Sequence, residues 1–544
     1  MKSNRSNKDR PVAGKMKRGG RSLSLAALVL FQVMVSLTGC QSRAADLSDT
    51  AVTGSDPAQA VNREEEIVLG GYRNIAPGPE DAYYCSVILY VWEPLITMDA
   101  AGEPAGKLAQ SWEVSEDART WTFHLREGVT FHDGQAFNAD AVLYNFERMR
   151  SGIRPSGFYS LNIDSFYPNL DQVTRLDDYT VELTFTEASP SLLYTMTNFG
   201  SAMFSPKCFD EAYNFIGIAQ GTGPFRIAGH VKDDYVLLER NEEYWGEPAA
   251  AAKIRVKTIP DVNTRYSALK AGEIMGVIDL NAMTPSLAVE LVKDPDFAIT
   301  ATNSTMIDFL CLNGTSAPFD DIRMRQAVSL AIDRQTIAEQ LYLGYVVPTT
   351  NILNYSTPFY TEFPVEHDIE KAKALSAEVL GEQRVTVTYL IQQDNAGQKA
   401  EAELIASVLP LIGIDVVIES YDWATIRDMM GKGEYGIARG QQGLSNMEAI
   451  TIFKRFMHSD GDQNHAYRLG CRDEAIDRLI GEADTEPDMK KRRDIYDRLQ
   501  EISVKRQPVV PLFNEKTLMV YNRRLTGYEA RIYGLDLSKI GWAE

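Results

Sequence analysis

Residues able to do covalent or metal chemistry do not fall into catalytic patterns in this chain. The sequence contains no H-E-x-x-H, G-x-S-x-G or G-x-x-x-x-G-K-[ST] motif and no dinucleotide-binding fingerprint. Ser267 and Lys270 have the S-x-x-K spacing of penicillin-binding enzymes, but the accompanying S-D-N and K-T-G motifs are absent. We therefore expect a protein that is not an enzyme and that uses no cofactor.

Cysteine spacing also excludes the common metal and redox motifs. Apart from Cys40, the cysteines are Cys85, Cys208, Cys311 and Cys471, and no two of them form a C-x-x-C pair. Four such residues allow three disulfide pairings in an oxidising compartment. Buried free thiols are nevertheless our prediction, because an isolated cysteine behaves as a small apolar residue.

The N-terminus has the pattern of an export signal. Residues 1–21 hold eight basic residues and one acid, and an apolar run follows from Leu23 to Leu37. This run is too short to span a membrane comfortably and is typical of a signal-peptide core. It ends in Leu-Thr-Gly-Cys40, which resembles a lipobox. We predict that residues 1–39 are removed and that Cys40 becomes the lipidated first residue of the mature chain.

A polar stretch separates this signal from the rest of the chain. Residues 40–62 are small and polar without an apolar period, so we expect a flexible tether with an r.m.s. span of about 25 Å. The chain has 544 residues and a net charge of −20. Its length predicts at least two lobes, and its acidity argues against nucleic acid or anionic lipid surfaces as partners. No run of 18 apolar residues follows the signal, so the lipid would supply the membrane attachment.

Strand and helix patterns alternate through the body, which predicts an α/β protein without internal repeats. Apolar and polar residues alternate at 121–126, 181–185 and 254–257, as in half-buried strands. Helical spacing of apolar residues recurs at 142–149, 324–331, 400–411 and 495–502. Asn138 is a suitable N-cap for the first of these helices, and Gly344 and Gly413 follow two of the others, where a left-handed C-cap is common.

Four stretches carry a family resemblance. They are Leu108–Val142, with Trp112, Trp121 and Asp133-Gly134; 221–246, with Gly221-Thr-Gly-Pro-Phe225 and Tyr244-Trp-Gly246; 259–273; and 312–334, with Ala331-Ile-Asp-Arg334. In order and spacing they resemble the family-5 extracellular solute-binding proteins, the receptors of peptide, nickel and related ABC importers. The glycines, the Asp-Gly turn and the tryptophans fit structural roles. The stretches therefore identify a fold and leave the solute open.

The resemblance implies a type II periplasmic-binding-protein fold, in which two lobes meet at a hinge. We expect lobe I to comprise residues 63–92, 205–302 and 509–544, an extra domain on it to comprise 93–204, and lobe II to comprise 303–508. The hinge should lie near Thr302-Asn303 and near Val509-Val510-Pro511. A solute would be captured between the lobes and delivered to permease subunits in the cytoplasmic membrane. The receptor would be a monomer on the outer face of that membrane, in the periplasm if the cell has an outer membrane.

The resemblance also suggests which residues face the solute. From lobe I these are Tyr83, Tyr84 and Cys85. From lobe II they are Arg439, Gln441, Gln442, Ser445 and Asn446, with Trp423 as a further candidate for an aromatic wall. Such a site is rich in amides and aromatic rings and has one cation, which suits a polar solute.

The identity of the solute stays open between several classes. Dipeptide receptors of this family use an aspartate near position 446 to pair with the α-amine, whereas Asn446 supplies no charge. Nickel receptors use an arginine before the stretch at 204–206, and Asn198-Phe-Gly200 stands there instead. His458 and His465 are weak metal-binding candidates, and solvent-facing roles suit them better. A peptide-like solute is our prediction; a metal chelate is the alternative, followed by an opine, an oligosaccharide or a sensory role.

Overall fold

The computed structural model describes the body of the chain in eight segments: residues 65–73, 88–99, 102–151, 163–279, 282–393, 395–443, 448–532 and 534–543. Residues 60–544 form one compact unit. The predictions for the signal segment, Cys40, the tether, Tyr83, Tyr84, Cys85, Ser445 and Asn446 lie outside the described residues. In the described segments, no helix is both long enough and apolar enough to cross a membrane.

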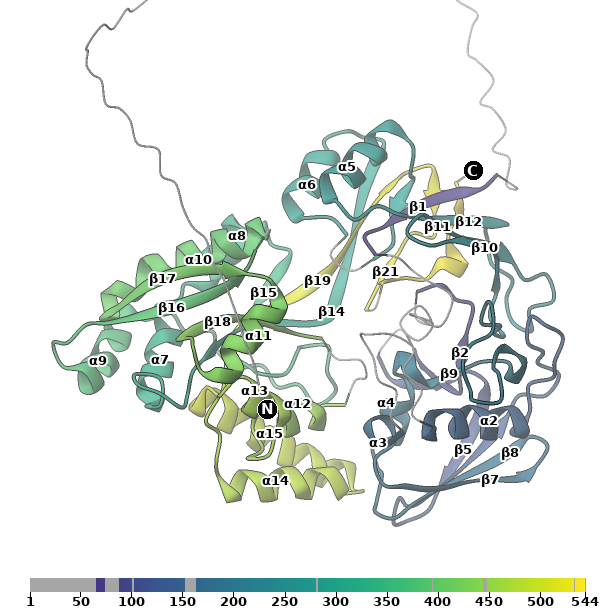
Figure 1. Ribbon diagram of the computed structural model, residues 1–544, viewed down its shortest axis with the longest axis horizontal. Coiled ribbons are helices and arrows are strands. Elements are labelled where there is room, and N and C mark those ends of the chain that lie inside the picture. The colour runs from purple at the N-terminus through teal and green to yellow at the C-terminus, as the bar shows by residue number, and fades with distance from the viewer. Residues whose placement is uncertain are drawn as a thin grey trace, which may run out of the picture. The chain divides into compact units, whose positions relative to one another are not determined.

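One large mixed sheet organises this body. Its strand order is β10 (Phe225–Val231), β11 (Tyr235–Arg240), β12 (Lys253–Thr258), β1 (Ile67–Gly71), β13 (Gly276–Val277), β19 (Val510–Asn522), β14 (Phe297–Leu312), β18 (Ile437–Gln442), β16 (Val385–Gln392) and β17 (Ile414–Tyr421). β15 (Val346–Pro348) pairs with β19 beside this path. β1 runs parallel to β12 and β13, and β16 runs parallel to β17 and β18. Figure 1 shows β14 and β19 running together between these two groups of strands.

The antiparallel β14–β19 pair is irregular at its middle. Its register shifts between Asn303 and Ile307, and again between Asp308 and Phe309. Such bulges bend a strand and interrupt its ladder of hydrogen bonds. The first irregularity directly follows Thr302-Asn303, where the sequence predicts a hinge. Hinge motion itself stays a prediction.

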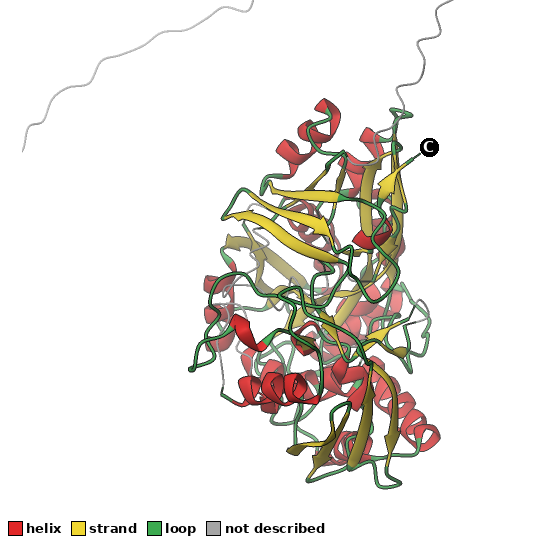
Figure 2. Ribbon diagram, turned by 90° about the vertical axis from the view of Figure 1, so that its right-hand side faces the viewer, coloured by secondary structure: helices red, strands yellow, loops and turns green. Residues whose placement is uncertain are grey.

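Four apolar cores fill the body. One packs around β1, β12 and β19 with Phe204 and Trp542; one packs under the 109–185 region with Phe123 and Phe146; two pack on opposite faces of the β14–β18 region. These cores are compatible with the predicted lobes, but the domain boundaries stay predictions. Figure 2 shows helices and strands mixed through the body, as the α/β prediction requires.

A separate antiparallel sheet lies in the segment predicted as the extra domain. Its order is β5 (Ala109–Val114), β6 (Thr120–Leu125), β8 (Thr180–Phe185) and β7 (Leu170–Asp177). α2 (Ala139–Arg150) packs against it through Val142, Phe146 and Met149. Asn138 caps α2 by accepting a hydrogen bond from the Ala141 amide at 3.1 Å. The strands at 121–126 and 181–185 and this capped helix are therefore confirmed.

The family stretch that begins at Gly221 packs against the segment that contains Val91 and Glu93. A Cβ at Gly221 would lie 2.1 Å from the carbonyl oxygen of Val91, so only glycine permits the approach. Thr222 donates to Oε2 of buried Glu93 at 2.8 Å, and the indole of Trp245 donates to the same oxygen at 2.9 Å. The structural role expected for the glycine and for Trp245 is thereby confirmed.

Helices cover the β16–β18 region. They are α7 (Ile322–Ala331), α8 (Arg334–Gln340), α9 (Ile369–Leu380), α10 (Ala396–Val408), α11 (Trp423–Lys432), α12 (Ile450–Phe456), α13 (Asp462–Ala466), α14 (Glu474–Thr485) and α15 (Met489–Arg506). Arg334 is buried, and its Nε donates to the carbonyl oxygen of Pro511 at 2.8 Å, which ties α8 to β19. Gly413 has φ +77° and caps the short helix after α10, as predicted. Ser267 and Lys270 lie in α5 (Val262–Ala271), near α6 (Pro285–Leu291).

Candidate functional site

Three polar side chains meet where β14, β18 and β19 lie side by side. Asp308 on β14 is opposite both Gln441 on β18 and Phe513 on β19, so these side chains share one face of the sheet. The amide nitrogen of Gln441 donates to Oδ1 of Asp308 at 3.2 Å and to Oε1 of Glu515 at 2.7 Å. Gln441 therefore bridges two carboxyl groups, one on β14 and one on β19, the two strands of the irregular antiparallel pair.

Arg439 lies next to this group but does not face solvent. Its side chain is 4% exposed, and its guanidinium contacts both oxygens of Asp308, with Nη1–Oδ1 at 3.0 Å and Nη2–Oδ2 at 2.9 Å. Its Nε donates to Oε1 of buried Glu401 at 2.7 Å, and Tyr342 donates to the other oxygen of Glu401 at 2.6 Å. Burial acts to lower the pKa of Arg439, but Asp308 and Glu401 outweigh it, and the pKa lies well above its usual value.

The prediction that Arg439 offers a free cation to the solute is wrong. Two buried carboxyl groups already neutralise its charge, and a buried ion pair of this kind does structural work. Asp308 and Glu401 are both held by this guanidinium, and Glu515 accepts a hydrogen bond from Gln441 nearby. Acidic side chains from three separate segments of the chain therefore gather around Arg439 and Gln441.

Gln442 points to the opposite face of the sheet. It is half-buried, and its side-chain oxygen accepts from Nη1 of Arg455 at 3.0 Å. Strand alternation makes this inevitable, since neighbours on a strand point in opposite directions. Gln441 and Gln442 therefore do not line the same side of the sheet, although both are predicted to face the solute.

Trp423 begins α11 directly after β17, and its side chain is 37% exposed. β16, β17 and β18 are parallel, so Trp423, Gln441 and Gln442 lie at or just beyond the carboxyl ends of these strands. In open α/β sheets, ligands bind in the crevice outside this edge. This edge therefore brings together Trp423, Gln441 and Gln442, whereas Arg439 lies further inside β18.

The two histidines do not form a metal site. Among the described residues, no group of three or more His, Cys, Asp or Glu side chains could hold a metal ion. His458 lies 3.9 Å from Asp477, and His465 lines a different pocket with Thr315 and Arg468. The structure brings neither histidine to Gln441.

Cys208, Cys311 and Cys471 are free thiols, as predicted, whereas Cys85 lies outside the described residues. Burial raises the pKa of Cys208 to about 11 and that of Cys471 to about 11. Burial also raises the pKa of the Cys311 thiol well above its usual value. None of the three is a nucleophile at neutral pH.

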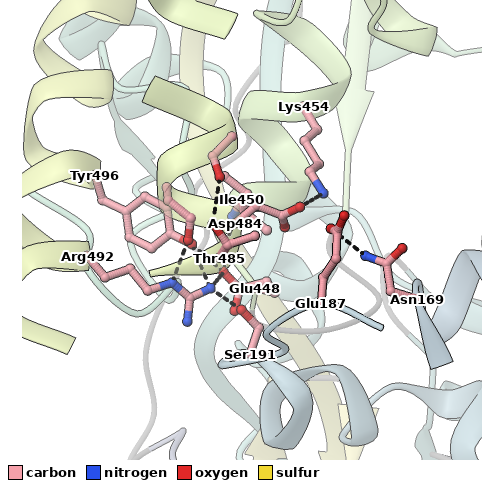
Figure 3. A network of polar contacts seen from close by, with 12 residues as sticks. Asn169, Glu187, Ser191, Glu448, Ile450, Lys454, Asp484, Thr485, Arg492 and Tyr496 are labelled. Atoms are coloured by element: carbon pink, nitrogen blue, oxygen red, sulfur yellow. Dashed lines mark hydrogen bonds and ion pairs between the residues drawn. The ribbon is translucent and has the colours of Figure 1, made fainter. Parts of the chain in front are cut away.

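A second polar network flanks the segment 444–447. Glu448 is buried, and its Oε1 accepts from the Tyr496 hydroxyl at 2.7 Å and from Nη2 of Arg492 at 3.1 Å. Arg492 also donates to the hydroxyl of Ser191. Figure 3 shows Arg492 and Tyr496 extending from α15 toward Glu448, with Ser191 approaching from the other side. Glu448, which follows the predicted ligand-facing loop, is thus held by α15, and Arg492 links the same helix to Ser191.

Sequence reasoning missed Asp308, Glu515 and Glu448. Asp308 and Glu515 stand inside long strands without a recognisable motif, and their partners are far away in sequence. A weak signal existed, since a buried strand that contains a carboxylate needs a partner for it.

Comparison with known proteins agrees with this fold. The model of the bacterial extracellular solute-binding proteins, family 5, matches residues 103–464, more than half of the chain. The chain belongs to this family. The family identification from sequence is therefore confirmed, and so is the two-lobe α/β fold.

Similar proteins include heme-binding protein A of Haemophilus influenzae, 27% identical over 80% of this chain and 83% of that protein. Di/tripeptide-binding protein 1 of Pseudomonas aeruginosa is 26% identical over 79% of this chain and 84% of that protein. Among solved structures, NikA from Brucella suis in complex with Fe(III)-EDTA superposes with a TM-score of 0.79 at 22% identity, covering 88% of this chain and 100% of that one. DppA from Helicobacter pylori in complex with peptide STSA superposes with a TM-score of 0.71 at 24% identity, covering 88% of this chain and 98% of that one. Heme-binding protein A, di/tripeptide-binding protein 1 and DppA are named as binding proteins.

Proposed function

We propose that this protein is the substrate-binding receptor of an ABC importer and that it captures a peptide or peptide-like solute without changing it. Family membership supports the receptor role. Relatives named for di- and tripeptides and for dipeptides support the peptide class. The observation that carries the choice of solute is the carboxyl group of Glu515 beside Gln441, 2.7 Å from its amide nitrogen.

A peptide α-amine needs an anionic partner, and Asn446 does not supply one. Glu515 places a carboxyl group on a neighbouring strand, where an ammonium group could pair with it. Asp308 is buried and is already held by Arg439. In this proposal the acidic partner has moved from the loop at 446 to the strand at 515. An anionic metal chelate is favoured less, because the nearby guanidinium of Arg439 is already neutralised.

Calorimetry with matched ligands tests the proposal. Short peptides with a free amine should bind at about one-to-one stoichiometry, whereas the same peptides acetylated on the amine should bind far more weakly. Nickel–histidine mixtures, opines and oligosaccharides serve as the competing classes. Recovered ligand should be unchanged by mass spectrometry. Tight binding of a nickel chelate with no response to any peptide would overturn the peptide assignment, and a cleaved ligand would overturn the receptor assignment.

The proposal includes a lipid anchor at Cys40, supported by the Leu-Thr-Gly-Cys sequence after an apolar run. With two or more acyl chains the receptor would stay on the membrane next to its permease. Cys40→Ser should move the protein from the membrane fraction to the soluble fraction. Retention of this variant on membranes after a salt wash would mean that another anchor exists.

A further inference from the structure

A pocket of about 310 Å³ lies on the part of the body built around β16–β18. Its lining includes Thr315, Gly431, Asn464, His465, Arg468 and Arg472. Thr315 follows β14, Gly431 lies near the end of α11, and the other four lie in or just after α13. Three segments that are distant in the sequence therefore build it.

This pocket is separate from the candidate site at Gln441. Register pairs Leu312 with Ile437 at the end of β14 and β18 that leads to the pocket, and Ile307 with Gln442 at the opposite end. Five residues of strand separate these ends, or about 17 Å. The pocket therefore has no part in the solute site proposed above.

The lining is basic and contains no carboxyl group. Arg472 makes no hydrogen bond or ion pair with any residue that the structure describes. The Nε of Arg468 donates to the carbonyl oxygen of Gly431 at 2.8 Å. Asp462 and Asp473, which are close in sequence, pair with Arg455 and Arg506, and Glu474 lies in the first turn of α14 outside the pocket lining. A basic lining is unexpected in a chain whose net charge is −20.

The backbone that carries these cations is held in place. Arg468 has φ +52°, a conformation that costs energy for any residue other than glycine. Gly470 has φ +75°, and a Cβ there would lie 2.4 Å from the carbonyl oxygen of Gly314. The buried amide of Asn464 donates to the carbonyl of Cys471 at 2.8 Å and accepts from its N–H at 3.0 Å. Strain held by tight packing is typical of a functional loop.

We propose that this pocket binds a small oxyanion of the phosphate type. The guanidinium groups of Arg468 and Arg472 suit the oxygens of such a group, since arginine forms paired, charge-assisted hydrogen bonds with phosphate. The ring of His465 also lines the pocket, whereas the hydroxyl of Thr315 donates to Oδ1 of Asn313 at 2.8 Å. Two sources carry this chemistry: a free inorganic anion, and the phosphate of an anionic lipid headgroup.

Calorimetry tests whether the intact chain binds a free anion. Inorganic phosphate is titrated at low ionic strength, with chloride as the comparison anion. Arg468→Gln and Arg472→Gln should each weaken phosphate binding roughly tenfold or more. Arg478→Gln is the matched control, because Arg478 is an exposed arginine on α14 that does not line the pocket. Circular dichroism checks that each variant folds; Arg472 is exposed and unpartnered among the described residues, so its variant keeps the test decisive.

Sedimentation with vesicles tests whether the pocket binds the phosphate of a lipid headgroup. It uses the Cys40→Ser chain, so that acyl chains do not contribute, and compares phosphatidylglycerol with phosphatidylcholine. Phosphate binding that depends on Arg468 and Arg472 supports a free anion. Binding to phosphatidylglycerol alone, with the same dependence, supports a lipid headgroup. No binding in either arm, or binding that the double variant Arg468→Gln, Arg472→Gln retains, would overturn the proposal.

Discussion

Arg439 and Asp308 meet through two parallel contacts, Nη1–Oδ1 at 3.0 Å and Nη2–Oδ2 at 2.9 Å, although 131 residues separate them. Both side chains are almost fully buried, at 4% and 0% exposed. Since Glu401 contacts the same guanidinium, the three residues form one buried ionic unit. Such a unit is sensitive to the loss of any member.

Replacing Arg439 should therefore affect folding more than anion recognition. Arg439→Gln would leave Asp308 and Glu401 buried without a counter-charge, and we expect a loss of about 3–5 kcal/mol in the free energy of unfolding. Urea denaturation measures this loss, with Arg478→Gln as the control that removes an exposed arginine. A variant with unchanged stability but abolished solute binding would show that Arg439 faces the solute after all.

Glu515 should decide the preference for an amine. Glu515→Gln keeps the size of the side chain and removes its charge, so affinity for a peptide with a free α-amine should fall roughly ten- to hundredfold. Affinity for the amine-acetylated peptide should change little. Asn446→Asp is the complementary variant, since it restores a carboxylate to the loop and should partly compensate. Calorimetry measures each of the two variants with each of the two peptides. If Glu515→Gln lowers the affinity for both peptides equally, Glu515 acts only through structure.

The network around Glu448 should couple α15 to the segment at Ser191. Arg492→Met would leave Glu448 buried beside Tyr496 without its cation, which should lower the free energy of unfolding by about 3 kcal/mol or more. Ser191→Ala removes one hydrogen bond and should cost about 1 kcal/mol. Ser189→Ala changes a nearby half-buried serine and should cost less. If both serine variants unfold at the same urea concentration as the parent chain, the contact between Ser191 and Arg492 contributes nothing to the folded state.

Stability should fall as the pH rises from about 9 to about 11. Burial raises the pKa of Cys208 and of Cys471 from 9.0 to about 11, so the unfolded thiols ionise in a range where the folded ones stay protonated. Their contribution is complete below pH 9 and is lost as the pH passes through 11. The double variant Cys208→Ala, Cys471→Ala should show a shallower fall in denaturation midpoints across this window. An identical slope would mean that other groups set the alkaline limit.

Local patterns gave reliable predictions wherever neighbouring residues decide the outcome. The alternation at 181–185 became β8, and Asn138 caps α2, because strand faces and helix caps depend on a few consecutive residues. The Gly221 stretch was correctly interpreted as structural, since the backbone of Val91 leaves no room for a side chain. Site residues were harder to predict, because their exposure depends on partners that are distant in sequence.

The sequence by itself determined the family and the α/β class, because these follow from the order and short-range spacing of residues; the export signal stays a prediction from the same kind of pattern. Only the tertiary structure decided that Arg439 is neutralised and that Gln441 bridges Asp308 and Glu515. Those contacts depend on which strands become neighbours and in what register. Sheet order joins residues 308, 441 and 515 through non-local pairing, and a shift of one residue would turn each side chain to the other face.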